Sequence, residues 1–197
     1  MLDHQKKKAG YEYLIAYKLT VPIYDLTIEF CKKYIDRFSR TKDQMEQAAR
    51  SGMQNIPEGY KQQGIKGYIK LSGVSRGSLE ELLNDYLSYA RQNNILIWSK
   101  EKCVGEIREI SQIWQRIKNN PTLPDCPNFP SLPDSKVKAV NLMITLIHQA
   151  NYFIDKLIVS LKEKHMKEGG LTEELYRKRI EYRSKNASRL TAPGVNQ

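Results

Sequence analysis

The sequence predicts an all-α protein: an antiparallel up-and-down four-helix bundle with a proline-rich strap and a C-terminal helical extension. Apolar residues recur at intervals of three and four over long stretches, which is the spacing of helices that bury one face. No stretch alternates apolar and polar residues as a half-buried strand does. A chain of 197 residues is long enough for one bundle and an appendage.

The bundle is expected to span residues 13–119. The apolar positions of its first helix run from residue 19 to residue 38. Pro22 suits a first turn, where the missing amide hydrogen costs little, so the regular helix is expected to start near Thr20.

Three further helices complete the predicted bundle. The second follows the break at "SRTKD", with Thr41 as its N-cap, and ends where Pro57 bends the chain ahead of Gly59. The third covers residues 65–90 and ends near "RQNN". The fourth covers residues 99–117 and stops at "KNNP".

A proline-rich linker is expected over residues 120–135. Its prolines recur at every third residue, which is the period of a polyproline II helix: Pro121, Pro124, Pro127, Pro130 and Pro133. We interpret the linker as an extended strap along the bundle. An irregular surface linker and a peptide ligand of the PxxP type are the alternatives.

A helical suffix is expected over residues 136–189. Its long helix has apolar residues from Val140 to Leu161 and ends at Gly169 and Gly170, the usual place of a left-handed cap. A short helix then starts at Thr172, and its sequence becomes basic from Tyr176 onward.

The composition indicates a polyanionic partner and gives no sign of a cofactor. Lys and Arg total 32 against 22 Asp and Glu, for a formal net charge of +10, which favours nucleic acid as a partner. The three cysteines and three histidines share no metal-ligand spacing, so neither a metal nor another cofactor is expected. The N-terminus lacks a signal-peptide pattern and no apolar run could span a membrane, so we expect a cytoplasmic protein without a membrane partner.

The stretch "SGMQNIPEGY" could hold either a structural carboxylate or a catalytic one. Small residues crowd the second and third helices here and allow their backbones to approach closely. A carboxylate at such a contact needs hydrogen-bond donors. We interpret the stretch as a polar node that sets the register of the two helices and consists of Asn55, Glu58, Ser78 and Glu81, with Arg76 or Arg50 as further donors.

The alternative is a hydrolytic enzyme that uses Glu58 with Glu80 or Glu81. Two carboxylates can divide acid and base roles when their environments separate their pKa values. No nucleophile and base pair, glycine-rich phosphate loop or metal motif accompanies them. We therefore expect no enzyme and assign no catalytic residue; a catalytic site would require a hydrated cleft around Glu58 and Glu81.

Three motifs carry a resemblance to a known family. They are Ala48-Ala49-Arg50-Ser51, Asn55-Ile56-Pro57-Glu58-Gly59 and Gly77-Ser78-Leu79-Glu80-Glu81. The chain resembles the bacterial four-helix bundle family that includes proteins encoded in intervening sequences of large-subunit ribosomal RNA genes and the accessory variability determinant of diversity-generating retroelements. The suffix resembles the one carried by a branch of that family.

The resemblance implies an all-helical, non-enzymatic accessory protein that assembles with itself, rings of five being known among relatives. For the retroelement protein it implies binding of nucleic acid and of a reverse transcriptase. This chain departs from the short members of the family by Gly52, where they carry a larger aliphatic residue, and by its suffix. Either difference could change the assembly.

Two basic and aromatic clusters are the candidate nucleic-acid contacts. Cations neutralise phosphates, and tyrosines stack on unpaired bases. The candidates are Lys61, Lys66 and Lys70 beside Tyr60 and Tyr68, and then Tyr176, Arg177, Lys178, Arg179, Arg183, Lys185 and Arg189 beside Tyr182. The alternative is a protein scaffold or adaptor whose basic surface attracts an acidic partner. Trp98, Trp114 and His148 are expected to be packing residues.

Overall fold

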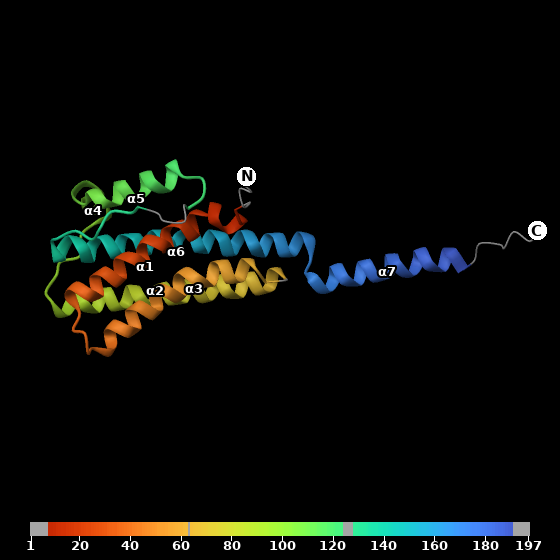
Figure 1. Ribbon diagram of the computed structural model, residues 1–197, viewed down its shortest axis with the longest axis horizontal. Helices are drawn as coiled ribbons and strands as arrows, with labels where there is room; N and C mark the ends of the chain where they lie inside the picture. The colour runs from red at the N-terminus through yellow and green to blue at the C-terminus, as the bar shows by residue number, and fades with distance from the viewer. Residues whose placement is uncertain (1–7, 63, 124–127, 191–197) are drawn as a thin grey trace, which may run out of the picture.

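The prediction of an all-α protein is confirmed. The computed structural model describes residues 8–62, 64–123 and 128–190, with backbone alone for residues 187–190, and these ranges contain helices and no strand. The elements, shown in Figure 1, are η1 Gly10–Tyr13, α1 Ile15–Tyr34, α2 Arg40–Tyr60, α3 Ile65–Gln92, α4 Lys100–Glu106, α5 Arg108–Asn119, α6 Lys136–Glu168 and α7 Leu171–Leu190. None of these helices is long and apolar enough to cross a membrane.

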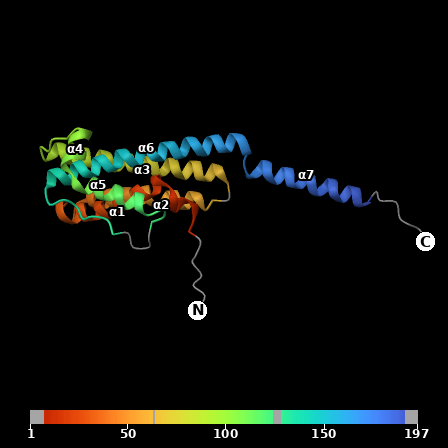
Figure 2. The same cartoon turned by 90° about the horizontal axis from the view of Figure 1, so that it is seen from above.

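The four long helices α1, α2, α3 and α6 lie side by side. α2 packs against α1 and α3, and α6 packs against α3 and α1, so the long helix of the suffix contributes to the same core as the first three helices (Figures 1 and 2). Each helix contributes fully buried side chains to that core, such as Leu19, Met45, Leu82 and Leu142.

The predicted continuous helix over residues 99–117 is interrupted. Ser99 caps α4 as expected, but the chain leaves helical geometry at Ile107, with φ −110° and ψ 96°, before α5 begins. Ile107 and Ile113 are fully buried, and Ile110 and Ile117 are each only 3% exposed. On either side of the break, α4 packs against α6, and α5 packs against α1 and α6.

Other predicted helix boundaries also differ. α1 starts at Ile15, so Pro22 lies inside it, because the buried stripe extends back through Ala16 and Leu19. Ser39, not Thr41, caps α2: the Thr41 amide donates to the Ser39 side chain over 3.2 Å. α2 continues through Pro57 to Tyr60 and does not end at Gly59.

Two glycines of α2 lie where α2 and α3 approach each other closely. A Cβ atom at Gly59 would lie 2.7 Å from a ring carbon of Tyr68 and 3.1 Å from the Cβ of Leu71. At Gly52 the neighbour would be Leu79, also on α3. The Ser75 hydroxyl donates to the Gly52 carbonyl over 2.5 Å. Backbones can be this close only where side chains are absent.

The end of the linker is tied to α1. The Leu132 amide donates to the Glu29 carboxylate over 2.9 Å, and the Tyr34 hydroxyl donates to the Asp134 carbonyl over 3.0 Å. Pro124 and Pro127 lie outside the described residues, so the predicted strap stays a prediction. Gly169 ends α6 with φ 78°, which confirms the predicted left-handed position of the cap.

Candidate nucleic-acid interface

Helix α7 extends away from the other helices with its side chains in solvent. All residues from 171 to 185 are exposed, and the helix continues the long axis of the molecule beyond the end of α6 (Figures 1 and 2). Such a helix lacks the one-sided apolar face that packs on a core. Its cations are therefore accessible over their whole length.

The first turns of α7 are fixed by short-range contacts. The Gly170 amide donates to the Glu173 carboxylate over 2.9 Å, and Lys178 donates to Glu174 over 2.6 Å. Arg177 donates to the Glu168 carbonyl at the end of α6 over 3.3 Å. Hydrogen bonding by Lys178 lowers the pKa of Glu174. Two of the predicted contact residues, Arg177 and Lys178, are thus already engaged within the chain.

Tyr176, Arg179 and Arg183 form one face of α7, which we call the basic face. Their spacing of three and four residues places them above one another on a helix. Tyr176 is 66% exposed, and within the described part of the chain neither arginine has an acidic partner within ion-pair distance. Lys185 is exposed on another face, and the side chain of Arg189 lies outside the described residues.

The structure brings the second predicted cluster to the same end of the molecule. Lys61, Lys66 and Lys70 are exposed at the turn between α2 and α3. A Cβ atom at Gly64 in this turn would lie 3.7 Å from the Cβ of Leu171. A cavity of about 320 Å³ is lined by residues of the turn, of α6 and of the first turn of α7.

The tyrosines of this turn are less available than the lysines. Tyr60 is 45% exposed, but its ring packs edge-on against Tyr68, with centroids 6.0 Å apart, and against Tyr11. The Tyr68 hydroxyl is buried, and burial, with a smaller effect of Tyr60, raises the pKa of Tyr68 to about 12. Tyr68 is therefore a packing residue.

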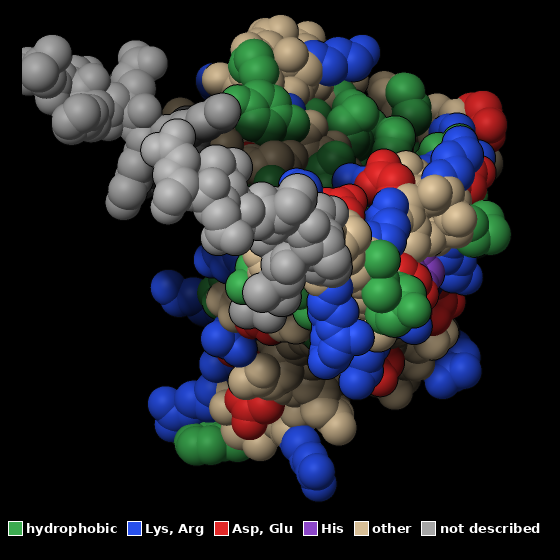
Figure 3. All heavy atoms as spheres, turned by 90° about the vertical axis from the view of Figure 1, so that its right-hand side faces the viewer, with side chains coloured by type: hydrophobic (Ala, Val, Ile, Leu, Met, Phe, Trp, Pro, Cys, Tyr) green, Lys and Arg blue, Asp and Glu red, His purple; other side chains and the backbone are tan. Residues whose placement is uncertain are grey.

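Figure 3 views this end of the molecule along its long axis. Lys and Arg side chains are spread around it, with Asp and Glu side chains among them. The cations form a broad distribution of positive charge and not one dense patch. Such a surface attracts polyanions in general more than it selects one sequence.

Two of the four residues of the predicted polar node, Asn55 and Ser78, lie at one polar contact between α2 and α3. Asn55 donates to the Ser51 hydroxyl over 2.9 Å, and the Ser51 and Ser78 hydroxyls are 2.8 Å apart, so a polar contact joins α2 to α3. Glu58 is exposed, and the prediction that it is buried there is wrong. It follows the buried Ile56 by two residues, which turns it about 200° away from that face.

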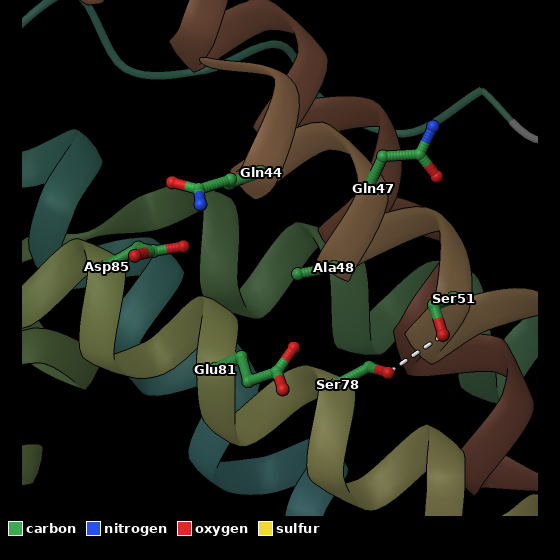
Figure 4. Close-up of a pocket in the computed structure, with 7 residues that line it drawn as sticks. All are labelled: Gln44, Gln47, Ala48, Ser51, Ser78, Glu81 and Asp85. Carbon is green, nitrogen blue, oxygen red and sulfur yellow. Dashed lines mark hydrogen bonds between the residues drawn. The ribbon is translucent and has the colours of Figure 1, made fainter. Parts of the chain in front are cut away.

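Glu81 is also exposed and lines an open polar groove. The groove has a volume of about 550 Å³ and lies between α2 and α3. Figure 4 shows its side chains: Gln44, Gln47, Ala48, Ser51, Ser78, Glu81 and Asp85. Burial, followed by the charge of Glu81, raises the pKa of Asp85.

Glu58 does not line this groove, so the two carboxylates of the hydrolytic alternative, Glu58 and Glu81, do not share it. The two carboxylates that do line it would repel phosphates.

A polar cluster between α3 and α6 was not predicted from the sequence. Arg76, which we expected near Glu58, contacts Glu80 at 2.6 Å and Asp155 of α6 at 3.2 Å. Asn151 of α6 donates to the same Glu80 carboxylate over 3.2 Å. The signal for this cluster in the sequence was the pair of polar residues Asn151 and Asp155, which lie four residues apart within a largely apolar stretch of α6. Within the described residues, no group of three or more potential ligands could hold a metal ion.

Comparison with known proteins finds a match to a protein family. The model of a family described as "23S rRNA-intervening sequence protein" matches residues 12–116. No curated protein and no solved structure matches the chain. The matched residues include α2, α3 and the turn between them, where the three motifs of the sequence analysis lie, and exclude α6 and α7.

Proposed function

The chain belongs to the 23S rRNA-intervening sequence protein family, and from this premise we propose that it is a non-catalytic protein that binds nucleic acid through the end of the molecule that carries α7. The observation that carries the proposal is the basic face of α7, Tyr176, Arg179 and Arg183, exposed on the helix that begins next to the lysine-bearing α2 to α3 turn. Guanidinium groups hold phosphates through paired hydrogen bonds, and an exposed tyrosine stacks on a base.

The marginal stability that α7 has on its own supports a binding role. A helix of 20 residues that packs on little else is only marginally stable in water. Glutamates in the first turn and ion pairs four residues apart contribute a few tenths of a kcal/mol each. A polyanion along the basic face would stabilise the helix further, so binding and helix formation are expected to be coupled.

The proposal includes the arrangement and assembly of the protein. We assign α1, α2, α3 and α6 to an antiparallel up-and-down bundle, because each packs on two of the others and neighbours run in opposite directions in Figure 1. The proline-rich linker is its strap. Self-association, into rings of five or another number, and an accessory role to a nucleic-acid enzyme such as a reverse transcriptase are carried over from the family resemblance.

A protein scaffold is the second candidate function. Leu175 is 56% exposed and Ile180 is 46% exposed on α7, and uncovered apolar residues on a projecting helix favour a protein partner. On this alternative, the cations of α7 attract an acidic protein surface. The two functions differ in whether nucleic acid binds at all when no partner protein is present.

Direct binding to a labelled RNA tests the proposal. We expect the full chain to raise the fluorescence anisotropy of the RNA, and the Arg179→Gln/Arg183→Gln variant to bind at least tenfold more weakly, since each charged contact contributes roughly 1 kcal/mol or more. The matched control is Lys32→Gln/Arg40→Gln, which removes two exposed cations at the opposite end of the bundle. Equal affinity of both variants, or no binding by the unaltered chain at low salt, would favour the scaffold.

A further inference from the structure

An aromatic cleft lies on the flank of the molecule, away from the basic face. It has a volume of about 620 Å³ and is formed by the segment before α4, by α5 and by α6. Both tryptophans of the chain line it. The lining residues are Ile97, Trp98, Lys100, Trp114, Ile144, Thr145, His148, Gln149, Tyr152 and Phe153.

Hydrogen bonds hold the Trp114 ring and the Trp98 backbone in place. The Trp114 Nε1 donates to the Gln149 Oε1 over 2.9 Å, which ties α5 to α6. The Trp98 amide donates to the buried Asn141 side chain over 2.7 Å, and Asn141 in turn donates to the Leu96 carbonyl over 3.0 Å. The Trp114 ring and the backbone that carries Trp98 are therefore positioned before a ligand binds, which reduces the ordering that binding requires.

The rim of the cleft is positively charged. Lys100 lines it, Lys102 lies 4.6 Å from the centroid of the Trp98 ring, and Lys156 lies 5.5 Å from that of Tyr152. None of the lining residues is acidic. The lining thus combines flat apolar surfaces with cations next to them, and its charge suits an anion.

We propose that this cleft binds an unpaired base of a single-stranded nucleic acid, with Lys100, Lys102 and Lys156 contacting its phosphates. A nucleotide joins a flat aromatic base to a phosphate, so a ring with an ammonium group about 5 Å away complements both parts. The inference rests on the proposed function, which it deepens by naming single strands as the substrate class. Bases stacked within a duplex would not enter the cleft.

Two polar groups face the base in this arrangement. The Gln149 oxygen is engaged by Trp114, which leaves its amide NH₂ to donate to a base carbonyl. His148 is exposed at the same rim and offers a further donor or acceptor. Neither selects one base uniquely, so weak base preference is expected.

Tryptophan fluorescence reports on this cleft directly, because the chain has no other tryptophan. We expect an oligouridylate single strand to quench the fluorescence saturably and a duplex RNA of equal length to leave it nearly unchanged. The exposed pair Lys100→Gln/Lys102→Gln should preserve folding and weaken the quenching constant. Trp98→Ala, if folded, should weaken single-strand binding by about 5- to 150-fold, the range for one stacked base.

The outcomes separate this inference from the proposed function. Single-strand binding measured by anisotropy without quenching would overturn the cleft and leave the proposed function standing. Quenching that persists in Arg179→Gln/Arg183→Gln, with affinity for RNA unchanged, would support the cleft and contradict the role of the basic face. Equal quenching by polyglutamate and by the single strand would overturn the base-specific inference, because the cleft would then recognise negative charge alone.

Discussion

Gly52 of α2 lies directly against Leu79 of α3: a Cβ atom at Gly52 would lie 2.5 Å from the Cδ2 and 2.8 Å from the Cγ of Leu79. Leu79 is fully buried, so it has no free space into which to move. A larger aliphatic residue at position 52 would therefore not fit against Leu79 as it stands.

Gly52→Ala is therefore expected to lower the free energy of unfolding by about 1–2 kcal/mol, because the overpacking cost of roughly 1–3 kcal/mol exceeds the helix-propensity gain of alanine. Urea denaturation measures this. Gly73→Ala on α3 is the matched control, since a Cβ atom there meets nothing within 4 Å, and it should raise stability by roughly 0.5–1 kcal/mol. Equal effects of both changes would contradict the packing account.

The contact at Gly52 shows how much of the helix packing could be predicted from the sequence. The crowding of small residues predicted a close contact of α2 and α3, and that contact exists at Gly52, Ser75 and Gly59. Gly73 and Gly77 belong to the same pattern but face solvent. Composition indicates that helices approach closely, and only the rotation of each helix about its axis decides which small residues lie in the contact.

The candidate site was predictable to a similar degree. The exposure of Arg179 and Arg183 follows from the strongly charged sequence of α7. That the lysines of the α2 to α3 turn lie at the same end depends on the length and direction of α6, a long-range property. The aromatic cleft was not predicted, because Trp98 and Trp114 are brought together with α6 only through the break at Ile107.

Arg76 is predicted to couple α3 to α6. A double-mutant cycle of Arg76→Met and Asp155→Asn should give a coupling free energy of about 0.5–1 kcal/mol, small because both side chains are partly in solvent. The pair Lys164 and Glu168, at 3.8 Å within α6, is the control, with about 0.3 kcal/mol expected for an exposed pair four residues apart. A coupling no larger than that of the control would exclude a role in joining the helices.

Lys18 is predicted to hold α5 against α1. It is only 4% exposed, and its ammonium group donates to the Asn120 carbonyl over 2.8 Å and to the Ile117 carbonyl over 3.4 Å. Lys18→Met leaves both carbonyls without this donor, so thermal or urea unfolding should show a loss of roughly 1–3 kcal/mol. Lys32→Met, an exposed change on the same helix, should stay within about 0.5 kcal/mol of the unaltered chain.

Cys31 is predicted to make stability fall at alkaline pH. Burial, with a smaller effect of Glu46, raises its pKa from 9.0 to about 12. Between these values the unfolded chain loses the thiol proton while the folded chain keeps it, so the unfolded state is favoured as pH rises. Urea unfolding at about pH 8 and about pH 10 should show a smaller decrease for Cys31→Ala than for the unaltered chain. An equal decrease in the free energy of unfolding of both proteins would show that Cys31 does not cause the loss of stability at alkaline pH.

The salt dependence of RNA binding tests the central claim, that the basic face of α7 contacts phosphates, most directly. For single strands the logarithm of affinity falls against the logarithm of salt concentration with a slope of about −0.7 per neutralised phosphate. Arg179→Gln/Arg183→Gln should therefore make the slope shallower by about 1.4, while Lys32→Gln/Arg40→Gln should leave it unchanged. An unaltered slope in the first variant would contradict the claim.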